Sequence, residues 1–360
     1  MKVPMAIILL LIHLVLFLAA TTLTSADKRG MRHQRQVLLR EKATLLALKQ
    51  GLALPPSSAA LENWNESNGH VCNFTGVTCD WRREHVVGLF PSFSGVPASI
   101  GNLTRLKRLV MNSNRISGAF PAVISGLSQL QNLDISCNRI SGTIPPALGG
   151  LGQLQTLNIS YNISGVIPPS FGNLTLLEEL IMYNNIISGG IPLAICNLTG
   201  LNTLEMSDNN LTGQIPAELS NLRNIGDIDL SNNQLYGEIP PSLSELTSLF
   251  YLNLHNNNLS GHIPAAIFLN CTGLGVFDVG NNSLSGEIPS MASSDTLAAT
   301  FAVLNLYSNR LTGKLPRWLA NCSRLYILDV EDNMLADELP ASIVAGKQYL
   351  KFLHLSDNLF

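Results

Sequence analysis

A repeat of about 24 residues runs through most of the chain and restricts the folds open to it. Each unit follows the loose pattern LxxLxLSxNxLSGxIP, and its asparagine returns at intervals of 23 to 27 residues. One such unit cannot bury its apolar face alone, so successive units must stack and share a continuous core. The eleven asparagines of this structural Asn ladder are Asn114, Asn138, Asn162, Asn185, Asn209, Asn233, Asn257, Asn282, Asn309, Asn333 and Asn358.

The apolar residues within each unit also keep their places. Leu204 and Met206 alternate with outward residues, which is the period-two pattern of a short strand. The Ser/Thr-Gly-x-Ile/Leu-Pro phrase then turns the chain, because glycine permits positive φ and proline blocks further pairing. The repeat therefore predicts a solenoid with one parallel sheet along its inner face. With 46% hydrophobic and 13% charged residues, the chain has enough apolar material for that core.

This arrangement resembles the plant-type leucine-rich repeat family, whose consensus LxxLxxLxLxxNxLSGxIPxxLxxLxx covers about residues 86–360. Residues 41–79 resemble the N-terminal cap of that family, with a helix in ATLLALKQGL and Phe74 in place of the usual tryptophan of C-x-W-x-G-V-x-C. The resemblance implies an α/β fold, a curved right-handed solenoid with a parallel β-sheet on its concave face. It also implies a helical cap closed by a Cys72–Cys79 disulfide.

The first residues read as a secretory signal, with Lys2 before an apolar run and small residues near Ala26. An uncleaved membrane anchor is the alternative, because the uncharged run approaches the length of a membrane span. We expect a signal peptide at 1–26, a cap at 27–85 and a solenoid at 86–360 that is incomplete at its C-terminus. The protein would then be secreted or lie on the extracellular face of the plasma membrane.

The remaining cysteines and the histidines give no catalytic pattern. Zinc ligation by His70, Cys72, Cys79 and His85 is an alternative to the disulfide, but its spacing does not suit a zinc finger. Cys271 and Cys322 replace leading leucines of repeats and should fill the core, while Cys137 and Cys196 should be free thiols. No kinase motif is present, so we expect no enzyme, no cofactor and no metal site; longer relatives carry a Ser/Thr kinase domain.

The outward positions of the predicted strands give the candidate ligand-binding surface. Five of the eleven central positions are acids, and aromatic side chains lie beside them, a composition common at binding hot spots. The same acids could also be merely solvated. Members of the resembling family that bind a peptide carboxylate often use an Arg-x-Arg pair, which is absent, so we expect a ligand with basic or neutral polar groups. The candidate residues are Tyr183, Glu205, Asp229, Tyr251, Asn253, His255, Asp278, Tyr307, Tyr326 and Asp329.

Twelve Asn-x-Ser/Thr sequences are potential glycosylation sites. Asn158 and Asn162 lie in the same stretch, but Asn158 is an outward strand residue and Asn162 belongs to the Asn ladder. We therefore expect sugar on Asn158 and none on Asn162. The sites expected to be accessible are Asn65, Asn73, Asn102, Asn158, Asn173, Asn197, Asn210, Asn258, Asn270, Asn281 and Asn321.

The family resemblance implies the ectodomain of a leucine-rich repeat receptor kinase or receptor-like protein. Such a protein would bind a peptide or microbial ligand together with a co-receptor of the same repeat class, and no nucleic acid. Contact with the membrane would come only through a missing C-terminal part or an uncleaved leader. The alternative is a secreted protein that resembles the polygalacturonase inhibitors and blocks a cell-wall-degrading enzyme.

Overall fold

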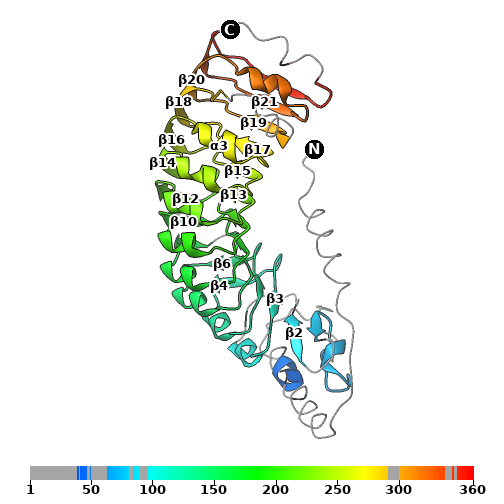
Figure 1. Cartoon of the computed structure of the whole chain (residues 1–360). Coiled ribbons are helices and arrows are strands. Elements are labelled where there is room, and N and C mark those ends of the chain that lie inside the picture. Colours follow the sequence, from blue (N-terminus) through cyan, green and yellow to red (C-terminus); the bar gives the residue numbers. More distant parts are fainter. Residues whose placement is uncertain are drawn as a thin grey trace.

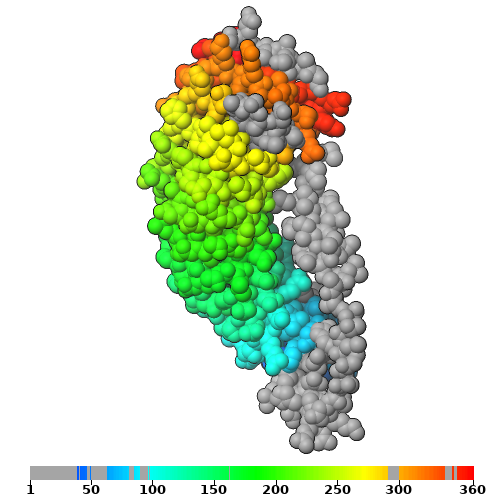
Figure 2. All heavy atoms as spheres, in the orientation of Figure 1, coloured from blue at the N-terminus to red at the C-terminus, as the bar shows by residue number. Residues whose placement is uncertain are grey.

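A computed structural model describes residues 39, 41–46, 49, 63–80, 85–89, 96, 98–161, 163–290, 300–336, 343 and 347–360. Within these residues, the repeats stack into one curved solenoid that runs from the cap to the C-terminal strand (Figure 1). Figure 2 shows the same stack as a continuous body in which neighbouring repeats are in contact. No helix among the described residues is both long and apolar enough to cross a bilayer. The predicted signal peptide lies outside the described residues.

The inner sheet has one short strand from each repeat, and all pairs are parallel except β1–β2, which is antiparallel. Its registers align the buried leucines of neighbouring repeats, so Leu204 pairs with Ile228 and Glu205 with Asp229. In order, its strands are β1 (Val77–Cys79), β2 (Val86–Leu89), β3 (Arg108–Val110), β5 (Asn132–Asp134), β7 (Thr156–Asn158), β9 (Glu179–Ile181), β11 (Thr203–Glu205), β13 (Asp227–Asp229), β15 (Tyr251–Asn253), β17 (Val276–Asp278), β19 (Val303–Asn305), β21 (Ile327–Asp329) and β23 (Phe352–His354).

A second parallel sheet lies on the convex side (Figure 1). It forms where each Ser/Thr-Gly phrase passes its neighbour, and the glycine takes positive φ, 87° at Gly213. The strands are β8 (Ser164–Val166), β10 (Ile186–Gly189), β12 (Asn210–Gly213), β14 (Gln234–Glu238), β16 (Asn258–Gly261), β18 (Ser283–Glu287), β20 (Arg310–Gly313) and β22 (Met334–Leu335), with a separate pair β4 (Ser117–Ala119) and β6 (Arg139–Ser141).

Short helices follow the Ile-Pro or equivalent apolar-Pro turns of most repeats, and one further short helix lies in the cap; the repeat pattern did not predict them. Proline precedes most of them in extended conformation, as Pro216 does with φ of −62°, and the next residues close a 3-10 turn. The helices are η3 (Val71–Asn73), η4 (Ala98–Asn102), η5 (Ala122–Gly126), η6 (Pro146–Gly150), η7 (Pro169–Asn173), η8 (Leu193–Asn197), η9 (Ala217–Asn221), η10 (Pro241–Glu245), α3 (Ala265–Asn270) and η11 (Arg317–Asn321).

The Asn ladder lies at the turns between the two sheets, where backbone groups would otherwise be buried without partners. The Asn209 amide nitrogen donates to the carbonyls of Met182 (2.9 Å) and Met206 (3.1 Å), and its oxygen accepts from the Ile187 amide (3.0 Å). Equivalent bonds to the preceding repeat are made by Asn138, Asn185, Asn233, Asn257, Asn282, Asn309, Asn333 and Asn358. Asn114 bonds within its own turn, and Asn162 lies outside the described residues.

The cap closes the N-terminal end of the core as the family resemblance implied. Cys72 and Cys79 form a disulfide, so the zinc alternative is wrong. Trp64 stacks on Phe74 with ring centroids 5.4 Å apart, which gives Phe74 the packing role of the usual tryptophan. Residues 41–46 are helical, and the buried Glu41 carboxylate accepts from the Val86 amide at 2.7 Å, which joins the cap to the first inner strands.

The other four cysteines are free thiols. Cys271 and Cys322 are fully buried in the core, as the leucine-like positions predicted. Cys196 is also buried, whereas Cys137 is exposed in the turn after β5.

Candidate ligand-binding surface

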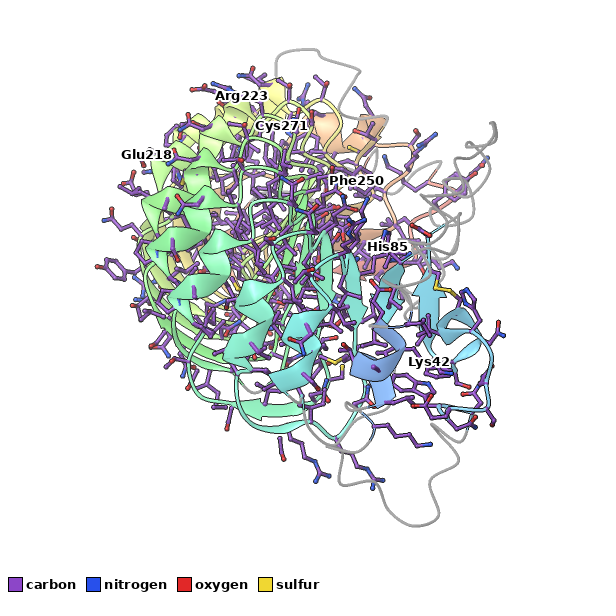
Figure 3. All side chains as sticks on the ribbon, turned by 90° about the horizontal axis from the view of Figure 1, so that it is seen from below. Lys42, His85, Glu218, Arg223, Phe250 and Cys271 are labelled. Carbon is purple, nitrogen blue, oxygen red and sulfur yellow. A yellow bond between two sulfur atoms is a disulfide. The ribbon has the colours of Figure 1, made fainter. Side chains whose placement is uncertain are left out.

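The concave face is built from the side chains that alternate with the buried leucines of the inner strands. Strand pairing places their central residues in one continuous row across eleven strands. Figure 3 shows Phe250 on this strand side of the solenoid, away from Glu218 and Arg223 on the helix side. The row reads Val110, Asp134, Asn158, Ile181, Glu205, Asp229, Asn253, Asp278, Asn305, Asp329 and His354.

Asp229 is the centre of a first hydrogen-bond network on this face. Its carboxylate accepts from the Tyr251 hydroxyl at 3.3 Å and from the Asn253 amide at 3.1 Å. The other carboxylate oxygen accepts from the backbone and hydroxyl of Ser231, at 3.0 and 2.6 Å. Burial and the nearby Asp229 charge raise the pKa of Tyr251, so its hydroxyl stays protonated and available as a donor.

Asp278 is the centre of a second network two repeats further along the sheet. It accepts from the Asn305 amide at 2.9 Å, and its other oxygen lies 3.9 Å from Nδ1 of His255. The Tyr307 hydroxyl lies 3.3 Å from the same imidazole nitrogen. Gly280 makes room for this arrangement, since a Cβ atom there would lie 2.6 Å from the Tyr307 ring. Burial raises the pKa of Asp278, partly offset by these hydrogen bonds and by His255.

Glu205 is the carboxyl group of the concave face whose pKa is raised most strongly. Burial, together with the negative charges of Asp229, Asp227 and Glu179, raises its pKa to about 7. These acids come from three neighbouring strands, β9, β11 and β13, and face one another across the sheet.

The concave face from β5 to β21 has many acids and no strong base. No lysine or arginine occurs in these strands or in the three residues on either side of each central position. The nearest bases along this register are Arg108 in β3 and Lys351 before β23. Many carboxylates in a concave surface whose strands carry no lysine or arginine produce a negative potential that attracts cationic groups.

The remaining candidate aromatics lie in two pairs outside the central networks. Tyr183 contacts Tyr161 edge-on with centroids 5.5 Å apart, and burial raises the pKa of Tyr183 to about 12. Tyr326 contacts Phe352 at 5.6 Å, and the Lys351 ammonium lies 5.3 Å from the Tyr326 ring centre. The structure therefore brings Asp229, Tyr251, Asn253, His255, Asp278 and Tyr307 together and places Tyr183 and Tyr326 toward either end.

Several residues of this surface were not among the candidates selected from sequence. Asp227 lies beside Glu205, and Asn305 bonds Asp278. Glu331 and His354 approach Asp329, and one ligand atom from each of the three lies within 4.8 Å of the others. Asn305 and His354 belong to the row of central outward positions expected from the sequence, and Asp227 and Glu331 lie two residues from a central position, where the strand register could also have found them.

The glycosylation sequences fall mainly on a different flank. Asn102, Asn173, Asn197, Asn270 and Asn321 each end a short helix, and all five are exposed. Asn65, Asn73, Asn210, Asn258 and Asn281 are exposed as well, while Asn158 on the concave face is half-buried. Sugars on the five helix ends would cover the helix side and leave the concave sheet open.

The fold and the repeat together define a leucine-rich repeat protein, and the chain belongs to that family. Residues 38–80 match the leucine rich repeat N-terminal domain, and residues 96–207 match a leucine-rich repeat region. Single leucine rich repeats match at 200–222, 224–246, 248–269 and 301–322, so repeat matches cover more than half of the chain.

Plant receptors are among the proteins most similar to this chain. A brassinosteroid LRR receptor kinase from Solanum lycopersicum is 36% identical over 116 residues, which is 31% of this chain and 9% of that protein. The structure of PEPR1–AtPEP1 superposes with a TM-score of 0.74 at 29% identity, over 89% of this chain and 49% of that one. Arabidopsis HAESA, solved with the peptide hormone IDA and the co-receptor SERK1, gives 0.72 at 30% identity, over 89% and 62%. The chain thus spans a small part of the tomato receptor kinase and about half of the chain in the PEPR1–AtPEP1 structure.

Proposed function

We propose that this chain is the extracellular ligand-recognition region of a plant leucine-rich repeat receptor and binds a peptide or protein ligand on its concave face. The observation that carries the proposal is the pair of acid and aromatic networks around Asp229 and Asp278. Structural similarity to receptor ectodomains solved with peptide hormones supports the same class of ligand.

The chemistry of the face favours a ligand with basic or neutral polar groups. Seven strands from β9 to β21 extend about 30 Å at about 4.8 Å per strand, enough for roughly nine residues of extended peptide at about 3.3 Å each. Acids would pair with lysine, arginine or an amino terminus, and Tyr251 and Tyr307 would contact apolar or cationic parts of the ligand.

The proposal gives the chain a binding role and no catalytic one. Signalling would need a kinase elsewhere in a longer protein or in a partner, and a second leucine-rich repeat protein would act as co-receptor. A polygalacturonase-inhibitor-like role on the same fold remains the alternative, and no feature of the concave face favours it over the receptor role.

A peptide screen with the purified glycosylated ectodomain tests the proposal. Synthetic ten-residue peptides with net charges from −3 to +3 would be arrayed, and the strongest binders measured by calorimetry.

Replacing Asp229, Asp278 and Asp329 together with lysine should lower the affinity for basic peptides at least tenfold. Replacing the same three residues with asparagine should lower that affinity as well. The control replaces Glu218, Glu238 and Glu287 with lysine. These residues are exposed outside the concave face, and the change of net charge is the same as in the concave lysine triple. Basic-peptide binding that survives the concave triple, or that is lost equally in the control, would refute this role.

A further inference from the structure

We propose that Asp329, Glu331 and His354 form a binding site for a divalent transition-metal ion such as Zn²⁺ at the β21–β23 end of the concave face. All three donor groups come from this chain, so the site needs no peptide ligand, although Asp329 also belongs to the candidate ligand-binding surface.

The strand register brings the three side chains together. β21 and β23 are parallel neighbours, and Asp329 pairs with His354 across them. Glu331 follows Asp329 by two residues, just beyond the end of β21, and its carboxylate reaches the same side as those of the other two donors. Oδ2 of Asp329 lies 2.9 Å from Nδ1 of His354, and one donor atom from each residue lies within 4.8 Å of the others.

The donor atoms can be reached from solvent, and a hydrogen bond holds the Asp329 carboxylate in a fixed orientation. The Asp329 side chain is 15% exposed and that of His354 is 48% exposed. The other Asp329 oxygen accepts from the Glu331 amide at 3.2 Å, which fixes the carboxylate plane and leaves Oδ2 directed at the imidazole. Within the described part of the chain, no lysine or arginine forms an ion pair with any of the three.

The donor set selects the kind of metal. One imidazole and two carboxylates suit Zn²⁺ and its first-row neighbours, whereas Ca²⁺ and Mg²⁺ prefer oxygen donors alone. A bound ion would take the place of the proton in the hydrogen bond between Asp329 and His354. It would also draw the Glu331 carboxylate toward these two side chains. Three protein donors leave at least one coordination position for water or for a group of a bound molecule.

A second His–Asp pair on the same face provides an internal comparison. Nδ1 of His255 lies 3.9 Å from Asp278, but Gly280 occupies the place that corresponds to Glu331. This pair therefore lacks a third ligand and should hold metal much less well.

Calorimetric titration of the untagged ectodomain with Zn²⁺ tests the site, in a Cys137→Ser background that removes the exposed thiol. We expect one ion bound per chain, with affinity falling at least tenfold in His354→Ala and in Glu331→Gln. His255→Ala should bind as the parent does, and Ca²⁺ should not compete at equal concentration.

If His354→Ala unfolds the last strand, the Glu331→Gln variant still tests the site. Glutamine has nearly the same shape as glutamate, so this variant should stay folded while it loses the anionic metal ligand. Unfolding would be detected by circular dichroism. Zn²⁺ affinity that is unchanged in a folded Glu331→Gln variant, or that is lost in His255→Ala instead, would overturn the proposal.

Discussion

Glu205 shows at the scale of one residue how a stack of strands alters the chemistry of a carboxylate. Its folded pKa of about 7 lies above the ordinary 4.5, so folding favours the protonated form. Between these values the unfolded chain loses the proton while the folded chain keeps it. The folded state therefore loses stability as pH rises through this window, and the cost is complete above pH 7.

Glu205→Gln should remove that cost. We predict that chemical denaturation at pH 8 gives a variant more stable than the parent by about 1 to 3 kcal/mol, with little difference at pH 4.5. Glu218→Gln on the helix side is the matched control and should show no such dependence on pH. A Glu205 variant whose advantage is the same at both pH values would contradict the effect of burial.

Two identical tripeptides also differ at the scale of one residue. Asn158 is an outward residue of β7, and its side-chain oxygen accepts from Ser160 at 2.9 Å. Asn162 falls on a ladder position by the repeat register of the sequence. We predict that glycopeptide mapping of protein made in plant cells finds sugar on Asn158 and none on Asn162.

Single serine changes separate the two acceptors. Ser160→Ala should abolish sugar in this stretch, and Ser164→Ala should leave it unchanged. The reverse pattern would mean that the repeat register is wrong at this point.

The Asn ladder explains stability at the scale of the structural element. Asn209→Ala would leave buried carbonyls of Met182 and Met206 and the Ile187 amide without this partner. We predict a loss of about 2 to 4 kcal/mol in the free energy of unfolding, measured by chemical denaturation. Asn210→Ala, at an exposed neighbouring position, should change it by less than about 0.5 kcal/mol. Equal effects of the two changes would argue against a structural role for the ladder.

The elements also show how far the sequence could predict the structure. The period located the inner strands because the buried leucines have fixed places in each unit, whereas the Cys72–Cys79 disulfide of the cap was implied by the family resemblance. The convex sheet and the helices η4 to η11 were not predicted, because they depend on how neighbouring turns pack. The contacts of Asp278 with Asn305 and of Asp329 with His354 join residues about 25 positions apart in the chain. They were not predicted, because they depend on side-chain orientation as well as on strand register.

At the scale of the whole molecule, the two sides of the solenoid have different surfaces. Exposed glycosylation sequences lie at the ends of five helices, and the acids and aromatics lie on the concave sheet. A ligand would therefore approach from the concave side, and a co-receptor would need an edge left free of sugars.

A photo-crosslinking map tests the central claim most directly. A basic peptide selected in the screen would carry a photoreactive residue at each position in turn, and cross-linked ectodomain residues would be identified by mass spectrometry. We predict cross-links to outward residues of β13 to β19, including Tyr251, His255 and Tyr307. Cross-links confined to the convex sheet or the helix side would contradict the assignment of the concave face as the ligand-binding surface.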